Sequence, residues 1–133
     1  MCLSYLKINS CSHSRRDEIA DIIHKNIDIL NEIAVTKNYK LGNEIDGVED
    51  VTFKYLGRED FFIDFYCRGI GIVPSGIYFG FYYISTDEPL GFQGDRVTFE
   101  KDGDGLRWQQ KNGDNYYYIE KILDHWYYYE AGF

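Results

Sequence analysis

The first third of the chain has the apolar spacing of an amphipathic helix. Apolar residues recur every three or four positions and charged residues occupy the other faces, as in a helix with one buried stripe. The stripe consists of Ile19, Ile22, Ile23, Ile27, Leu30, Ile33 and Ala34. Asp17 and Glu18 fall in the first turn, where the helix dipole favours anions. Because Gly42 and its polar neighbours end any continuation, the spacing predicts a helix from about Arg15 to Lys37.

Beyond residue 50 the apolar period becomes two, which indicates β-strands. The expected strands cover 51–55, 61–68, 77–85, 96–101 and 106–111. Residues 77–85 are so apolar that we expect both faces of this strand to be covered. The last two strands surround the Asp-Gly-Asp-Gly segment at 102–105, whose glycines supply the positive φ angles of a tight hairpin turn.

The C-terminal segment 116–130 carries two conflicting signals. Its tyrosines favour a strand, but its apolar residues keep a three-and-four spacing with charged residues between them. That spacing is carried by Ile119, Ile122, Leu123, Trp126 and Tyr127. We give periodicity precedence over this length and expect a helix from about Tyr117 to Glu130. The predicted fold class is α+β, a single domain (1–133) in which an antiparallel sheet of about five strands packs against an N-terminal and a C-terminal helix.

Composition adds an acidic balance to this picture. The chain has 22 Asp and Glu against 14 Lys and Arg, for a formal net charge of -8. This excess argues against binding of nucleic acid, because phosphates need cations. Residues 42–50 hold four acids and no base, and residues 87–104 hold six acids and two bases, so each segment carries a net charge of -4. If the two segments meet, they form a negative patch that steers a basic partner; solubility alone is the other interpretation.

The cysteines and the N-terminus suggest a cytoplasmic protein. Cys2, Cys11 and Cys67 have no CxxC spacing, so we expect reduced thiols. The N-terminus lacks the pattern of a secretory signal. Residues 69–86 form an uncharged stretch of 18 residues, but Pro74, four glycines and the alternation favour a turn and a buried strand over a membrane span. We therefore expect no contact with a membrane.

No residue pattern in the chain predicts a reaction. The histidines lack metal-ligand spacing, and the Asp-Gly-Asp-Gly segment lacks the remaining oxygen ligands of a calcium loop. We expect neither a metal site nor a cofactor. If the protein were a small enzyme or a carbohydrate binder with an aromatic-lined cleft, its first candidates would be His125, Asp124 and Glu120. A helix face with solvated charges is the favoured interpretation of these residues.

About 25 residues near the C-terminus resemble a known class of proteins. The residues are Arg107-Trp108, Gly113-Asp114-Asn115, Glu120-Lys121-Ile122 and Trp126 to Tyr129. This segment is similar to small acidic immunity proteins of bacterial polymorphic-toxin and contact-dependent growth inhibition systems. The resemblance implies a cytosolic protein without catalytic residues. Such a protein binds one cognate toxin, often a basic nuclease, and occludes its active site.

The leading hypothesis is therefore a protein-binding module, not an enzyme, that neutralises a toxin through charge complementarity and aromatic anchors. The expected contact residues are the acids Asp87, Glu88, Asp95, Asp102 and Asp104 and the aromatic residues Tyr82, Tyr83 and Trp108. The alternatives are the aromatic-cleft enzyme or carbohydrate binder and a subunit whose aromatic tail lies in a dimer interface. The sequence leaves open the oligomeric state, the toxin and the role of the tail tyrosines.

Overall fold

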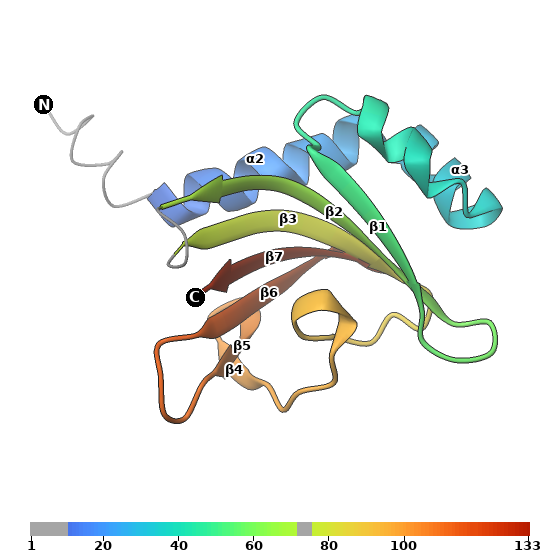
Figure 1. Cartoon of the computed structure of the whole chain (residues 1–133). Coiled ribbons are helices and arrows are strands. Elements are labelled where there is room, and N and C mark those ends of the chain that lie inside the picture. The colour runs from blue at the N-terminus through green and yellow to red at the C-terminus, as the bar shows by residue number, and fades with distance from the viewer. Residues whose placement is uncertain (1–10, 72–75) are drawn as a thin grey trace, which may run out of the picture.

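A curved, fully antiparallel sheet organises the chain in the computed structural model, which describes residues 11–71 and 76–133 (Figure 1). Within these residues the sheet has seven strands in the order β1-β2-β3-β7-β6-β5-β4. The strands are β1 (Asp50–Tyr55), β2 (Phe61–Ile70), β3 (Ile77–Ile84), β4 (Glu100–Asp102), β5 (Gly105–Gln109), β6 (Tyr116–Leu123) and β7 (Trp126–Gly132). The α+β class and the antiparallel sheet are thus confirmed, but the expected count of about five strands is too low.

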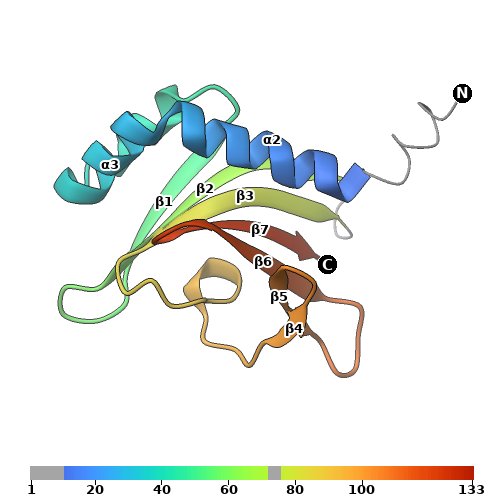
Figure 2. The same cartoon turned by 180° about the vertical axis from the view of Figure 1, so that it is seen from behind.

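The two helices lie on one face of this sheet, and an irregular segment lies on the other (Figure 2). Helix α2 (Cys11–Lys25), helix α3 (Ile27–Thr36) and the short 3-10 helix η1 (Tyr39–Glu44) follow one another before β1. The opposite face carries the connection between β3 and β4 with its 3-10 turn η2 (Phe92–Gly94). The sheet is therefore covered on both faces.

The predicted single helix 15–37 is interrupted at Asn26. This residue leaves the helical region, with φ -113° and ψ 20°. Its side-chain Nδ2 donates a hydrogen bond to the carbonyl oxygen of Ile22 at 2.8 Å, and such a local bond competes with the helical ladder. The chain bends there, and α2 and α3 follow the curved sheet as two segments (Figure 2).

The predicted C-terminal helix is wrong. Residues 116–132 form the hairpin of β6 and β7, closed at Asp124 and His125, where His125 adopts φ 73°. Strand β7 pairs with β3 as well as with β6. Because the sheet is covered on both faces, apolar residues occupy both sides of these strands, and their positions happen to match a three-and-four spacing. The strand propensity of the tyrosines prevails once β3 pairs with β7.

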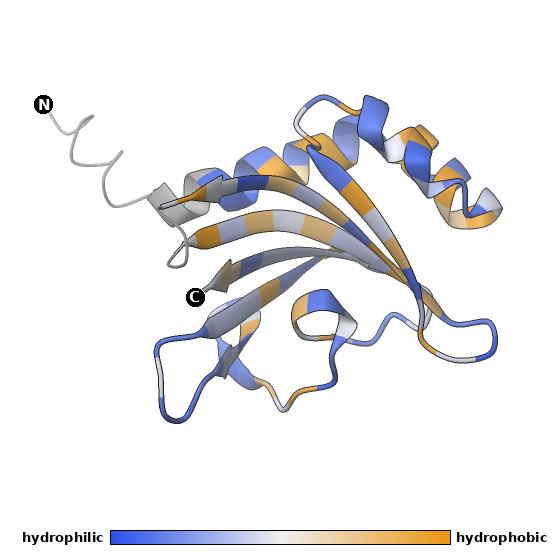
Figure 3. Cartoon of the chain, viewed as in Figure 1, coloured by the Kyte–Doolittle hydropathy of each residue, from blue (hydrophilic) through white to orange (hydrophobic). Residues whose placement is uncertain are grey.

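The alternation of side chains along the strands divides the core into two layers. The layer beneath the helices includes Ile23, Leu30, Ile33, Phe65, Phe81, Trp126 and Tyr128. The layer beneath the β3–β4 connection includes Phe62, Tyr82, Ile84, Leu90, Tyr117, Ile119, Tyr127 and Tyr129. Successive ribbon segments of the helices change from orange to blue in Figure 3, as the amphipathic pattern predicts.

The five predicted strands are present with shifted bounds. The strands expected at 51–55, 61–68 and 77–85 correspond to β1, β2 and β3. The hairpin around the Asp-Gly-Asp-Gly turn is present, but β4 has only three residues. The expected connection at 69–76 lies partly outside the described residues. Pro74 and Cys2 lie wholly outside them.

Candidate functional site

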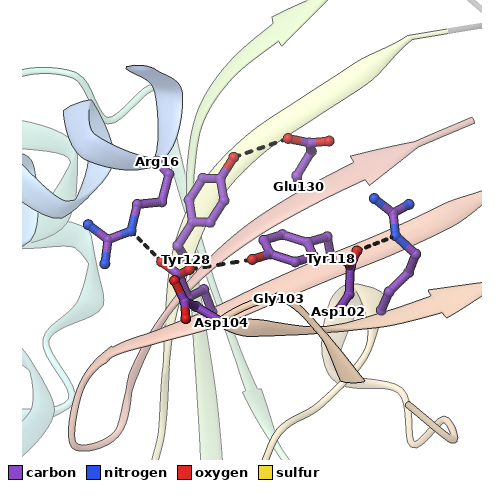
Figure 4. A pocket seen from close by; sticks show the side chains of 9 residues that line it. Arg16, Asp102, Gly103, Asp104, Tyr118, Tyr128 and Glu130 are labelled. Carbon is purple, nitrogen blue, oxygen red and sulfur yellow. Dashed lines mark hydrogen bonds and ion pairs between the residues drawn. The ribbon is translucent and has the colours of Figure 1, made fainter. Parts of the chain in front are cut away.

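A hollow of about 320 Å³ lies on the helix-bearing face of the sheet, beside the N-terminal half of α2 (Figure 4). Helix α2 packs on β3 and β7, and the hollow opens over the strands that follow β7 in the sheet. We call it the acidic hollow. Its lining residues are Arg16, Asp102, Gly103, Asp104, Arg107, Tyr118, Glu120, Tyr128 and Glu130.

Carboxylates outnumber cations in the acidic hollow by four to two. Glu120 is the one buried charged residue of the described core. It forms an ion pair with Arg16, and it also accepts a hydrogen bond from the Tyr118 hydroxyl at 3.4 Å. Arg107 donates to Asp102 at 2.8 Å. The hollow therefore has a net negative charge.

Phenol groups hold a second carboxylate of the hollow, the half-buried Glu130, in place. The hydroxyl of Tyr116 donates to Glu130 at 2.5 Å, and that of Tyr128 donates to the other oxygen of the same carboxylate at 3.2 Å. Burial raises the pKa of Tyr118 to about 12, with Glu120 adding to the effect. Burial and Glu130 likewise raise the pKa of Tyr116 and of Tyr128. These phenols stay protonated at neutral pH and act as hydrogen-bond donors.

Glycines allow these tyrosine rings to lie flat on the sheet. Gly105 of β5 sits under the ring of Tyr118, and Gly132 of β7 sits under the ring of Tyr116. A Cβ atom at either glycine would collide with the ring above it. The guanidinium of Arg107 stacks on both rings, with its Cζ atom 4.7 Å from the centroid of Tyr116 and 5.9 Å from that of Tyr118. Packing and hydrogen bonds together hold the floor of the hollow rigid.

Two of the five predicted contact acids, Asp102 and Asp104, lie in this hollow. Glu88 is exposed and forms a loose ion pair with Arg96 at 3.8 Å. Asp95 is exposed at the end of η2, on the other side of the sheet. The acids of segment 87–104 therefore lie on more than one surface and do not form one continuous patch.

Asp87, the remaining predicted contact acid, is held in hydrogen bonds within the protein. It accepts hydrogen bonds from the Lys121 ammonium at 2.6 Å, from the backbone N–H of His125 at 2.8 Å and from the Tyr127 hydroxyl at 3.2 Å. Burial opposes ionisation, but these bonds prevail and lower the pKa of Asp87. The side chain thus ties the segment after β3 to the β6–β7 turn.

The three predicted aromatic anchors lie away from the acidic hollow. Tyr82 is fully buried in the η2-side core, where its hydroxyl bonds to the backbone of Leu90, so it offers no surface to a partner. Tyr83 is half-buried and stacks on Phe61 and on the ring of His125. Trp108 packs against the η2-side core layer.

The residues proposed for an enzymatic cleft do not converge. Glu120 is held by Arg16 in the acidic hollow. Asp124 is exposed in the β6–β7 turn and pairs with Lys121 at 3.3 Å, whereas His125 places its Nδ1 atom 2.8 Å from the carbonyl oxygen of Ile84. Among the described residues no cluster of three or more His, Cys, Asp or Glu side chains has the arrangement of a metal site.

Neither the Cys67 thiol nor the described helices add a candidate site. Cys67 is a half-buried free thiol. Burial, with a contribution from Asp64, raises its pKa to about 12, so it is not a thiolate at neutral pH. In the described ranges, no helix combines the length and the apolar character needed to cross a membrane.

Comparisons of the chain with models of protein families, with curated proteins and with solved structures found no match. The geometry of the molecule is therefore the basis for a functional assignment. Sequence reasoning missed Glu130 as a member of the acidic hollow and Tyr116 as the residue that donates a hydrogen bond to it. The alternation of Tyr116, Tyr118 and Glu120 indicates a common face once 116–123 is read as a strand.

Proposed function

We propose that this chain is an immunity protein, a module that binds one cognate toxin domain and covers its active site. The observation that carries the proposal is the acidic hollow, in which four carboxylates and tyrosine rings face two guanidinium groups. A toxin that acts on nucleic acid has a basic active site, because it must neutralise phosphates. The hollow has the opposite charge.

The charge of the whole chain supports the same function. A net charge of -8 attracts a basic partner over a distance and raises its association rate. Glu88 and Asp95 are exposed and contribute to this long-range attraction without lying in the hollow. Asp102 and Asp104 contribute both to the attraction and to the contact.

The rigidity of the hollow supports slow dissociation from a partner. Tyr116, Tyr118 and Glu130 are held by hydrogen bonds, by stacking and by the glycines beneath the rings. Little side-chain entropy is then lost on binding. Tyrosine is also enriched among residues that dominate binding energy, because its ring supplies contact area and its hydroxyl a polar handle.

The proposal predicts a toxin domain in the protein encoded immediately upstream, and it is tested with that domain. Co-expression of the two is expected to protect cells, and the purified pair is expected to form a stable complex by calorimetry. Absence of both protection and complex formation would overturn the proposal.

Charge reversal then locates the contact. Asp104→Lys places a cation in the acidic hollow and is expected to weaken the complex at least tenfold. Asp46→Lys makes the same change at an exposed turn before β1 and is the matched control, with affinity changed less than threefold. Equal effects of the two variants would show that the contact lies elsewhere.

A further inference from the structure

A second cavity, of about 310 Å³, lies on the opposite face of the sheet, between the strands and η2. It is lined by Asp50, Thr52, Asp64, Tyr66, Tyr78, Phe92, Gln93 and Tyr129. These residues come from β1, β2, β3, β7 and η2, so the cavity is built by the core of the sheet and closed by the β3–β4 connection. We call it the aromatic cavity.

Four of the eight residues that line the cavity are aromatic. The centroids of Tyr66 and Tyr78 are 6.0 Å apart, and Phe133 extends the row at 5.8 Å from Tyr78 and 4.9 Å from Phe92. Tyr129 completes the wall from β7. Its ring lies over Gly80, where a Cβ atom would collide with it.

A carboxylate lies among these rings. Asp64 is half-buried, and its Oδ1 atom is inaccessible to solvent and has no hydrogen-bond partner among the described residues. A buried carboxylate oxygen without a partner is costly in a folded protein and calls for an explanation. Asp50 adds a second carboxylate to the cavity wall.

The described lining of the cavity contains two acids and no base. Lys54 points to the same side of β1 as Thr52, but its ammonium bonds to the carbonyl oxygen of Gln93 at 3.3 Å. The carboxylate of Asp64 therefore has no counter-ion within the wall of the cavity.

We propose that the aromatic cavity binds an organic ammonium group, with Asp64 as its counter-ion and the faces of Tyr66, Tyr78 and Tyr129 around its alkyl part. Aromatic faces attract cations, and this attraction is strongest where water is excluded. An anion would meet two carboxylates, and a neutral ligand would leave Asp64 without a counter-charge. The volume is at the lower end of the range for ligand pockets, which favours a small amine or a single lysine side chain.

The site is independent of the proposed immunity function, because it lies on the other face of the sheet from the acidic hollow. The first test titrates the full chain at pH 7.5 with butylammonium chloride and, separately, with its neutral isostere butan-1-ol, followed by amide NMR shifts. Saturable shifts around Asp64 and Tyr78 are expected for the ammonium alone. Equal shifts with the alcohol, or none with either probe, would overturn the proposal.

Variants identify the counter-ion. Asp64→Asn keeps the shape of the side chain and removes a buried charge, so it is expected to fold and to bind butylammonium at least tenfold more weakly. Asp46→Asn removes an exposed charge outside the cavity and is expected to keep wild-type affinity. Unchanged affinity in Asp64→Asn contradicts the proposal. Tyr78→Leu, which removes one aromatic face, is a second variant with an expected loss of about threefold or more.

A further titration separates the two sources of the ammonium group. Nα-acetyl-lysine methylamide presents a lysine side chain with its backbone. Binding of this probe with the same Asp64 dependence supports a lysine of a partner protein as the occupant, and binding of butylammonium alone supports a free amine.

Discussion

Asp64 holds a carboxyl group beneath aromatic rings, where it has little access to water. Burial raises its pKa from the ordinary 3.8 to about 6, although the nearby Tyr129 hydroxyl acts in the other direction and Asp50 adds to the rise. Between these pH values the folded chain binds a proton that the unfolded chain releases. The contribution of Asp64 to stability therefore falls as the pH rises from about 4 to about 6 and stays low above that.

Asp64→Asn removes this pH-dependent contribution. Because one pKa unit corresponds to about 1.4 kcal/mol, the free energy of unfolding of the variant relative to wild type should rise by about 3 kcal/mol between pH 3 and pH 7. Urea denaturation at the two pH values measures it. Asp46→Asn, at an exposed turn, should keep the wild-type profile, and an Asp64→Asn difference that does not vary with pH would contradict the assignment.

Asp87→Asn should have the opposite sign. Three hydrogen bonds, one of them from Lys121, outweigh burial and lower the pKa of Asp87, so its stabilisation is present above the unfolded pKa and is lost as the pH falls through the folded one. Asparagine tolerates the φ of 58° at this position, which isolates the effect of charge. We expect a loss of about 1 to 2 kcal/mol at pH 7 and almost none at pH 2, measured by the same denaturation.

At the scale of the elements, close approach between strands and tyrosine rings depends on glycine. A Cβ atom at Gly105 would collide with the carbonyl oxygen of Ile119 and with the ring of Tyr118. Gly105→Ala should therefore destabilise the fold by about 2 kcal/mol or more. Gly57→Ala is the matched control, since no atom lies within 4 Å of the position of its Cβ. Thermal unfolding measures the stability of both variants. Equal losses of stability in Gly105→Ala and Gly57→Ala would contradict the packing argument.

The elements that the sequence predicts correctly are those whose signals are local. Alternation over 51–55 and 61–68 and the glycines of the turn at 102–105 are sufficient for hairpins between neighbours in the sequence. The β6–β7 hairpin turns at Asp124 and His125 without a glycine, so no local signal marks it. The partner that stabilises β7 is β3, more than 40 residues earlier, and a pattern within the segment cannot indicate it.

Because 117–130 was expected to be a helix, the sequence did not predict that Glu120 and Glu130, two of the four carboxylates of the acidic hollow, lie together. Asp102 and Asp104 could be predicted as site residues because they belong to a turn with a local sequence signal. Glu120 and Glu130 face the same hollow only because β6 and β7 run side by side as strands; on the expected helix, ten residues apart, they would not have joined Asp102. The aromatic cavity depends likewise on strand order, which brings Tyr66 of β2 and Tyr129 of β7 to either side of Gly80.

At the scale of the whole molecule, negative charge is spread over several surfaces rather than gathered in one patch. Association with a basic toxin should then depend on salt mainly through the rate of encounter. We expect the association rate constant to fall about tenfold between 20 mM and 300 mM NaCl, with a smaller change in dissociation. Stopped-flow mixing measures both rates. A salt-independent association rate would contradict electrostatic steering by this surface.

Strand order also governs when the fold can be completed during synthesis. The sheet consists of a β1–β3 half and a β4–β6 half, and β7, the last of the strands to be made, lies between them. Neither half has its central neighbour until Trp126–Gly132 has left the ribosome, and the edges of β3 and β6 stay unpaired until then. The sheet is therefore completed only after Trp126–Gly132 has been made, and a chain halted before residue 126 exposes the open edges of β3 and β6 to other proteins.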